Sequence, residues 1–183
     1  METMPWENIV CEIPPGYAVG SFYWCEISLD SLETADDMVR VPTVHSSTKV
    51  IAATRAVEQG LVERRVSAAL NAKVEYVLFE SVSTQQTRDT ITEITKHNSK
   101  SIATKHLAGE VGSAAQMVRE LVGMAELGAD IVKIAYFAHT PSAIAMGLDA
   151  LQLAQETIDK PISITPMGTR WGRVAAAMAG SQL

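Results

Sequence analysis

His106 and Lys133 are the two side chains whose types and spacing could carry out covalent chemistry. His106 ends a strand-like run, IATKH, and Lys133 lies inside a second apolar run, DIVKIAY. Lysine is depleted from strand interiors, and burial favours its neutral amine, which can attack a carbonyl carbon. A strand-end imidazole beside that amine could move protons. The pair therefore predicts imine (Schiff-base) chemistry.

Both residues also have a structural interpretation. A lysine in a strand can cap a barrel end or pair with a carboxylate, and a histidine at a strand end is more often structural than catalytic. The two strands are separated by an amphipathic helix with apolar residues at spacings of three and four, which predicts successive βα units. Their placement at C-terminal strand ends favours the catalytic interpretation, because α/β barrels carry their active sites there.

Short apolar strands alternate with helix-like segments along the chain. The pattern predicts strands at 22–27, 50–54, 74–79, 101–104, 130–136 and 161–165, with a further one at 8–13. It predicts helices at 31–39, 61–72, 84–97, 112–127, 141–158 and 170–179. Pro141 suits a first helical turn, and Gly128 suits a helix end. Continuous apolar strands between helices indicate a mostly parallel sheet with both faces covered.

The predicted fold is α/β, a TIM-type (β/α)8 barrel in a single domain over residues 1–183. A closed barrel usually needs about 200 residues or more. The pattern supplies about seven strands, so we expect an incomplete barrel whose last βα unit is missing. A dinucleotide-binding fold is disfavoured, because Gly109 and Gly112 do not form the glycine-rich fingerprint after a strand.

Composition argues against several classes of protein. The 183 residues are 47% hydrophobic and carry a net charge of −6, which disfavours nucleic acid or an anionic membrane as the main partner. No apolar run reaches the roughly 18 residues that span a bilayer, and the N-terminus lacks the pattern of a signal peptide. Cys11 and Cys25 are expected to be buried free thiols, which indicates a reducing cytoplasm.

Several motifs, in their order along the chain, resemble type I 3-dehydroquinate dehydratase, the Schiff-base enzyme of the shikimate pathway. LGADIVKIA (127–135) resembles the family's imine-lysine strand, and the spacing from His106 to Lys133 fits the family. CEISLD (25–30) resembles its ElRlD strand end, and AATRAVEQG (52–60) its T-x-R followed by an acidic residue and glycines. PISITPMG (161–168) and GRVAAAMAGS (172–181) resemble its late strand, its arginine and its Gly-Ser.

The resemblance implies conversion of the small molecule 3-dehydroquinate to 3-dehydroshikimate and water. Lys133 would form an imine with the C3 ketone, and His106 would act as acid and base. Arg173 would pair with the substrate carboxylate, Arg55 would contact polar groups, and Met167 would supply an apolar wall. The full set of implied substrate-binding residues is Glu26, Ser28, Arg55, Gln59, Met167 and Arg173. The lysine itself is the electron sink, so neither a metal nor an organic cofactor is implied.

The chain departs from the family pattern at several places. Ser28 stands where the family has an arginine, which removes a cation from the expected anion pocket. Gln59 stands where the family has the acid that orients the imidazole, which could leave His106 a poorer base. Two residues are deleted between Met167 and Arg173, and the C-terminal strand and Pro-Gly-Gln loop have no counterpart. Because a missing strand leaves an open sheet edge, we expect a homo-oligomer, most simply a dimer, or a partner that covers the gap.

Two other functions remain open. The chain could be another Schiff-base lyase or aldolase, in which Ser28 and Gln59 change the specificity. It could also be a non-catalytic barrel homologue that serves as a binding or scaffold protein. Individual residues have structural alternatives, such as a solvated helix position for Arg173 and a structural carboxylate for Glu26. The same holds for Glu80, for Arg170 and Trp171 as loop residues, and for His45, His97 and His139 as surface histidines.

Overall fold

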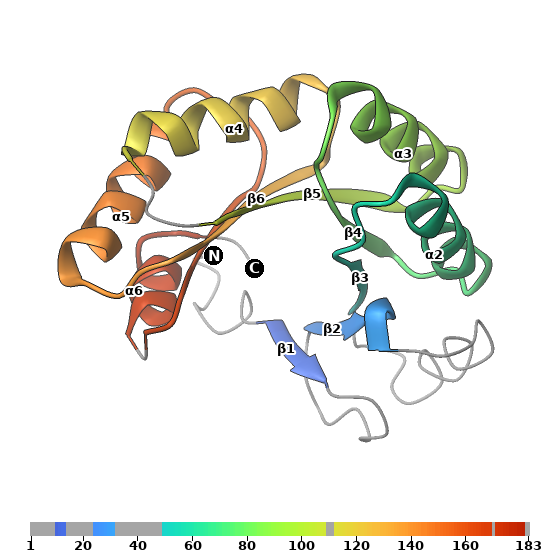
Figure 1. The fold of residues 1–183 in the computed structure, drawn as a ribbon, viewed down its shortest axis with the longest axis horizontal. Coiled ribbons are helices and arrows are strands. Elements are labelled where there is room, and N and C mark those ends of the chain that lie inside the picture. The colour runs from blue at the N-terminus through green and yellow to red at the C-terminus, as the bar shows by residue number, and fades with distance from the viewer. Residues whose placement is uncertain (1–9, 14–23, 32–48, 109–111, 170, 182–183) are drawn as a thin grey trace, which may run out of the picture. The chain divides into compact units, whose positions relative to one another are not determined.

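A computed structural model describes residues 10–13, 24–31, 49–108, 112–169 and 171–181 (Figure 1). Two compact units make up the chain, Met1–Ile102 and Ala103–Leu183. The predicted helix 31–39, apart from its first residue, and the first positions of the strands predicted at 8–13 and 22–27 lie outside the described residues. The expectation of a single domain stays a prediction.

The first unit is built on strands that follow one another in the sheet in chain order. They are β1 (Val10–Ile13), β2 (Trp24–Ser28), β3 (Lys49–Thr54) and β4 (Tyr76–Glu80), and each is parallel to the next. A 3-10 turn, η2 (Leu29–Ser31), follows β2. The helices of this unit are α2 (Gln59–Asn71) and α3 (Thr84–Lys96), which contact each other. All five residues of β4 are buried, as expected of a strand covered on both faces.

The second unit repeats the same alternation. Its strands are the greater part of β5 (Lys100–Leu107), then β6 (Ile131–Phe137) and β7 (Ile162–Met167), again in chain order. Its helices are α4 (Ala114–Glu126), α5 (Pro141–Gln155) and α6 (Gly172–Met178). In this unit α4 packs on β6 and on α5, while α5 and α6 both pack on β7. The α/β class with parallel strands is thereby confirmed.

Local sequence explains where most helices begin and end. Ser83, Ser113 and Thr140 accept a hydrogen bond from a backbone N–H in the first turn of α3, α4 and α5, respectively. Pro141 is the first residue of α5, as predicted. Gly128, at φ 104°, follows the C-cap of α4 in a conformation that side-chain-bearing residues rarely adopt, which confirms it as a helix end.

Some boundaries differ from the predicted ones. The strand expected at 101–104 continues to Leu107 as β5, so His106 is its penultimate residue rather than its last. Strand pairing uses backbone groups, so half-buried polar side chains such as Lys105 do not end it. Helix α2 begins at Gln59, before the expected 61, because the Glu58 carboxylate accepts a hydrogen bond from the Gly60 N–H at 3.0 Å.

Two further expectations concern cysteines and membranes. Cys25 is a free and buried thiol, as predicted, whereas the side chain of Cys11 lies outside the described part of the chain. Among the described helices, none combines the length and the apolar character that crossing a bilayer requires.

Candidate active site

Tyr136 shows which face of β6 the helices cover. Its hydroxyl donates a hydrogen bond to the carbonyl of Ala143 on α5 at 2.9 Å, and Gly147 of α5 packs against its ring. Side chains alternate between the two faces of a strand. Lys133, three residues before Tyr136, therefore lies on the face of β6 opposite α5.

The strand register extends this assignment to β7. Lys133 is paired with Ser163, and Phe137 with Met167, so these side chains share one face of the sheet. The intervening Pro166 lies on the other face, where Gly172 of α6 packs against it. The structure thus brings Lys133 and Met167 to the same face of the second unit, opposite the face on which α5 and α6 pack.

Lys133 is half-buried rather than fully buried, which corrects the premise of a lysine enclosed in an apolar strand. Its neighbours on this face are small: Ala135 on the same strand and Ser163 on β7 are both almost fully buried. Strand β5, which carries the half-buried His106 near its carboxyl end, is adjacent to β6 in the sheet. The candidate acid/base and the candidate nucleophile therefore come from neighbouring strands of one unit.

Arg173 lies in different surroundings. It is exposed on α6, the helix that packs on the opposite face of β7, where Gly172 lies against Pro166. Trp171, at the start of the same helix, is 74% exposed, and Arg170 lies outside the described residues. The role of Arg173 toward the substrate carboxylate stays a prediction.

In the first unit, the predicted residues of β2 and β3 also meet on one face. Glu26 is buried, and its Oε1 lies 4.0 Å from Nη2 of Arg55, the residue directly after β3. Ser28 is paired with Ala53, two residues before Arg55, so Ser28 shares this face. A carboxylate, a hydroxyl and a guanidinium are therefore grouped at the carboxyl ends of two adjacent strands.

Glu80 belongs to the same face. Ala53 is paired with Leu78, and Glu80 follows two residues later as the buried last residue of β4. The other face is covered by α2, since Arg65 of that helix reaches the Thr54 hydroxyl at 3.4 Å. The charged strand-end groups of the first unit thus lie on the face that α2 does not cover.

Asp30 is a residue of this region whose importance the sequence did not reveal. Its Oδ1 accepts hydrogen bonds from the Thr54 hydroxyl at 2.9 Å and from Nη1 of Arg65 at 2.6 Å. Its Oδ2 accepts from the backbone N–H of Arg55 at 2.9 Å. The sequence pattern contained Asp30 only as the last letter of the CEISLD motif.

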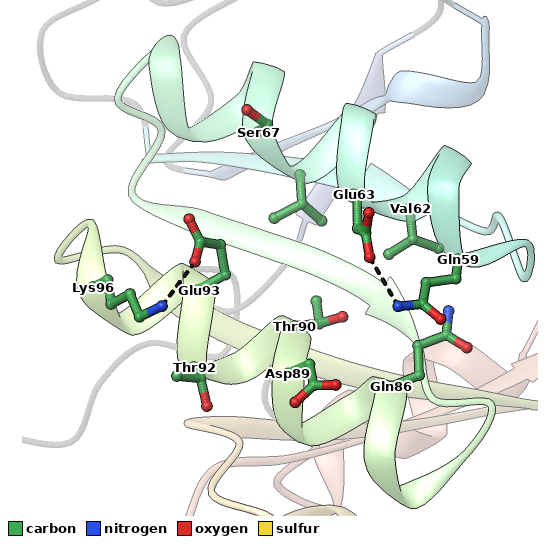
Figure 2. Close-up of a pocket in the computed structure, with 11 residues that line it drawn as sticks. Gln59, Val62, Glu63, Ser67, Gln86, Asp89, Thr90, Thr92, Glu93 and Lys96 are labelled. Atoms are coloured by element: carbon green, nitrogen blue, oxygen red, sulfur yellow. Dashed lines mark hydrogen bonds and ion pairs between the residues drawn. The ribbon is translucent and has the colours of Figure 1, made fainter.

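Gln59 lies at the start of α2, where its amide nitrogen donates to Oε1 of Glu63 at 2.9 Å. It lines a pocket of about 420 Å³ between α2 and α3 (Figure 2). The carboxylates there are already hydrogen-bonded within their own helices, Glu63 by Gln59, Asp89 by Gln85 and Glu93 by Lys96. This pocket holds none of the other predicted site residues, so we assign the candidate site to the strand ends.

The remaining titratable groups offer no second centre in the part of the chain that the structure describes. His97 and His139 are exposed, as expected, and His139 stacks on Phe137 with ring centroids 5.7 Å apart, while His45 lies outside the described residues.

Burial raises the pKa of Tyr136 to about 12, and a backbone hydrogen bond at Gly147 partly offsets this rise. No group of three or more His, Cys, Asp or Glu side chains that could hold a metal ion occurs among the described residues.

Solved structures confirm the fold. The type I 3-dehydroquinate dehydratase of Clostridium difficile, with covalently modified comenic acid, is 16% identical with a TM-score of 0.81, over 98% of this chain and 76% of that chain. The 3-dehydroquinate dehydratase of Enterococcus faecalis is 19% identical with a TM-score of 0.80, over 88% of this chain and 76% of that chain. The fold is thus an incomplete TIM-type α/β barrel.

The same fold also serves other chemistry. The carboxyl transferase domain of Rhizobium etli pyruvate carboxylase, solved with pyruvate, is 14% identical with a TM-score of 0.67, over 88% of this chain and 32% of that chain. Fold likeness alone therefore does not choose an activity. No curated protein matches the chain.

A comparison of the sequence, rather than of the fold, identifies the family of this chain. The model of the family described as type I 3-dehydroquinase matches residues 25–183, which contain Glu26, Arg55, His106 and Lys133. The chain belongs to the type I 3-dehydroquinase family.

Proposed function

We propose that the chain is a dehydratase that forms an imine between Lys133 and the ketone of 3-dehydroquinate. The observation that carries this proposal is the position of Lys133, half-buried on the face of β6 opposite α5, with Ser163 as its register neighbour. Ser163 and Ala135 are short side chains, and we propose that a ring bearing a carbonyl group binds beside the ammonium end above them. Membership of the 3-dehydroquinase family supports the identity of that ring.

In the proposed reaction, the neutral amine of Lys133 attacks C3 of 3-dehydroquinate, and water leaves to give an iminium. The iminium withdraws electrons from the adjacent C2–H bond, and His106 removes that proton. The electron pair forms a C1–C2 double bond as the C1 hydroxyl departs with a proton from His106. Hydrolysis of the iminium then releases 3-dehydroshikimate and restores the amine.

Other residues are proposed to bind the substrate. The Arg55 side chain is 56% exposed while its guanidinium stays near Glu26, so it can contact polar groups of a ligand. Met167 shares the face of Lys133 and is proposed as an apolar wall. Ser28 is proposed to line the same face as Glu26, and Arg173 to meet the substrate carboxylate. For Gln59, the hydrogen bond to Glu63 supports a local role at the start of α2.

We also propose that the protein self-associates, most simply as a dimer. Trp171, the N-cap residue of α6, and Val174 and Met178 within α6 are exposed at spacings of three and four residues, which supports one apolar stripe along this helix. Sedimentation equilibrium should give twice the chain mass, and Val174→Asp should lower that mass. A monomer at all concentrations would contradict the proposal.

A cytoplasmic location is also proposed, because the thiol of Cys25 is free and buried.

Borohydride trapping tests the imine. The protein is reduced with sodium borohydride in the presence of 3-dehydroquinate, and intact and peptide masses are measured. A ligand-sized adduct on Lys133, absent in Lys133→Ala, is expected. Lys105→Ala is the matched control, because it removes another half-buried strand lysine of the same unit and should keep the adduct.

A second candidate function is a Schiff-base lyase or aldolase for a different keto acid. The half-buried Ser28 favours it, because a short neutral side chain occupies a position beside Glu26 where family members carry a cation. Trapping with pyruvate but not with 3-dehydroquinate would support this candidate. Failure to trap any carbonyl compound on a protein with a folded circular dichroism spectrum would favour a binding or scaffold role.

A further inference from the structure

We propose that Asp30 is a positioning residue that holds Arg55 in place for the substrate. The inference deepens the proposed function and rests on it for the role of Arg55. The hydrogen bonds that support it lie within the first unit and do not depend on any role of Lys133.

Asp30 uses both carboxylate oxygens, and each one is directed to the end of β3. Its Oδ2 accepts from the backbone N–H of Arg55 at 2.9 Å. Its Oδ1 accepts from the hydroxyl of Thr54, the last residue of β3, at 2.9 Å. One side chain therefore holds both the Thr54 hydroxyl and the backbone N–H of Arg55.

The same carboxylate connects three elements of the unit. Asp30 lies in η2, two residues after the end of β2, and Thr54 ends β3. Arg65 on α2 completes the cluster, with Nη1 2.6 Å from Oδ1 of Asp30. Its charge compensates the carboxylate, which is only 30% exposed. The cluster sets the path of the chain where it leaves the sheet.

These contacts restrict the directions in which the Arg55 side chain can point. Its backbone is fixed by Asp30, and its guanidinium lies 4.0 Å from the buried Glu26 on the face that α2 does not cover. A long arginine side chain loses less freedom on binding when its starting point is already fixed. Asp30 thus acts on the substrate through Arg55 and does not touch it.

The test measures how tightly the ligand binds, not only how fast it is converted. The half-saturating concentration of 3-dehydroquinate for borohydride trapping on Lys133 is compared in the wild type, Asp30→Asn, Arg55→Ala and the double variant. Binding of quinate, a hydroxylated ring carboxylate without the ketone, is measured in the same proteins by calorimetry. Asp89→Asn is the matched control, since this exposed carboxylate on α3 accepts a hydrogen bond from Gln85 and lies outside the cluster.

We expect Asp30→Asn to raise the half-saturating concentration and the quinate dissociation constant about tenfold, the scale of one charge-assisted hydrogen bond. Because Asp30 acts through Arg55, the double variant should be no weaker than Arg55→Ala. A merely structural role would lower the melting temperature and leave both ligand constants unchanged, which overturns the inference. An equal further loss in the Arg55→Ala background also overturns it.

The quinate measurement separates this inference from the proposed function. If the wild type gives no adduct but binds quinate, and Asp30→Asn weakens that binding, the imine is rejected and the role of Asp30 stands. If the wild type binds neither compound, both are overturned.

Discussion

Lys133 on β6 lies beside Ser163 on β7 in a parallel pair, and Ser163 is fully buried. On the opposite face of β6, Ile134 and Tyr136 are completely buried toward the helices. The strand is therefore anchored by its apolar side, while its other side presents a lysine next to a short hydroxyl side chain. This division allows a lysine within a strand without loss of packing on the helix side.

Replacement of His106 by alanine should separate imine formation from proton transfer. We expect His106→Ala to lower kcat for 3-dehydroquinate by about 10²- to 10⁴-fold, the usual contribution of a general acid/base. The borohydride adduct on Lys133 should persist at saturating substrate. Product formation followed by absorbance gives kcat, and mass spectrometry gives the adduct. His97→Ala, which removes an exposed histidine at the end of α3, should keep full activity, and equal losses in both variants would contradict the assignment.

Ser181 should stabilise the last described strand. Its hydroxyl accepts a hydrogen bond from the Ile164 N–H at 2.9 Å and lies 3.4 Å from the Ile164 carbonyl oxygen, and all these groups are buried. Ser181→Ala leaves a buried N–H without that partner, so the free energy of unfolding should fall by about 1–3 kcal/mol. Urea denaturation measures this change. The exposed Ser67→Ala on α2 should change it by less than about 0.5 kcal/mol, and an equal effect of both substitutions would exclude the proposed role.

Local patterns in the sequence predicted the elements that position the candidate site. The strand that holds Lys133, the parallel order, Pro141 and Gly128 all follow from residue types within a few positions of one another. The extent of β5 could not be predicted, because the polar residues Lys105 and His106 interrupt its apolar pattern while the backbone continues as a strand to Leu107.

Contacts between residues that are far apart in the sequence could not be predicted from local patterns. Asp30 bonds to residues 24, 25 and 35 positions away, and no local pattern distinguishes it from another turn aspartate. The motif predicts Gln59 as a substrate-binding residue, and its amide donates to Glu63 four residues along its own helix. The face on which a side chain lies can be predicted where its strand position decides it, and cannot be predicted where distant hydrogen-bond partners decide it.

Tyr136 should make stability depend on alkaline pH. Burial raises its pKa from 10.0 to about 12, so the folded protein holds the phenol proton more tightly than the unfolded chain. The stabilisation is fully present below pH 10 and is lost as the pH rises from 10 to about 12. The pKa difference corresponds to about 3 kcal/mol. Urea denaturation between these pH values should show this loss in the wild type relative to Tyr136→Phe, and parallel curves for both proteins would contradict it.

Gly147 should tolerate no side chain while Tyr136 keeps its hydroxyl. A Cβ at position 147 would overlap the Tyr136 hydroxyl and lie 2.8 Å from the ring carbon Cζ. Both residues are buried between β6 and α5, so Gly147→Ala should lower the free energy of unfolding by about 1–3 kcal/mol. Tyr136→Phe removes the hydroxyl, and the double variant should be more stable than the sum of the single effects by about 1 kcal/mol.

Gly123→Ala provides the matched control for this coupling. Gly123 lies in α4, where a Cβ meets no atom within 4 Å, so alanine should raise stability by up to about 1 kcal/mol through its helix propensity. Its effect should add to that of Tyr136→Phe, because the two positions share no contact. If Gly147→Ala and Tyr136→Phe are equally additive in urea denaturation, the hydroxyl does not set the close approach of α5 to β6, and the helix must instead be held there by its other apolar contacts.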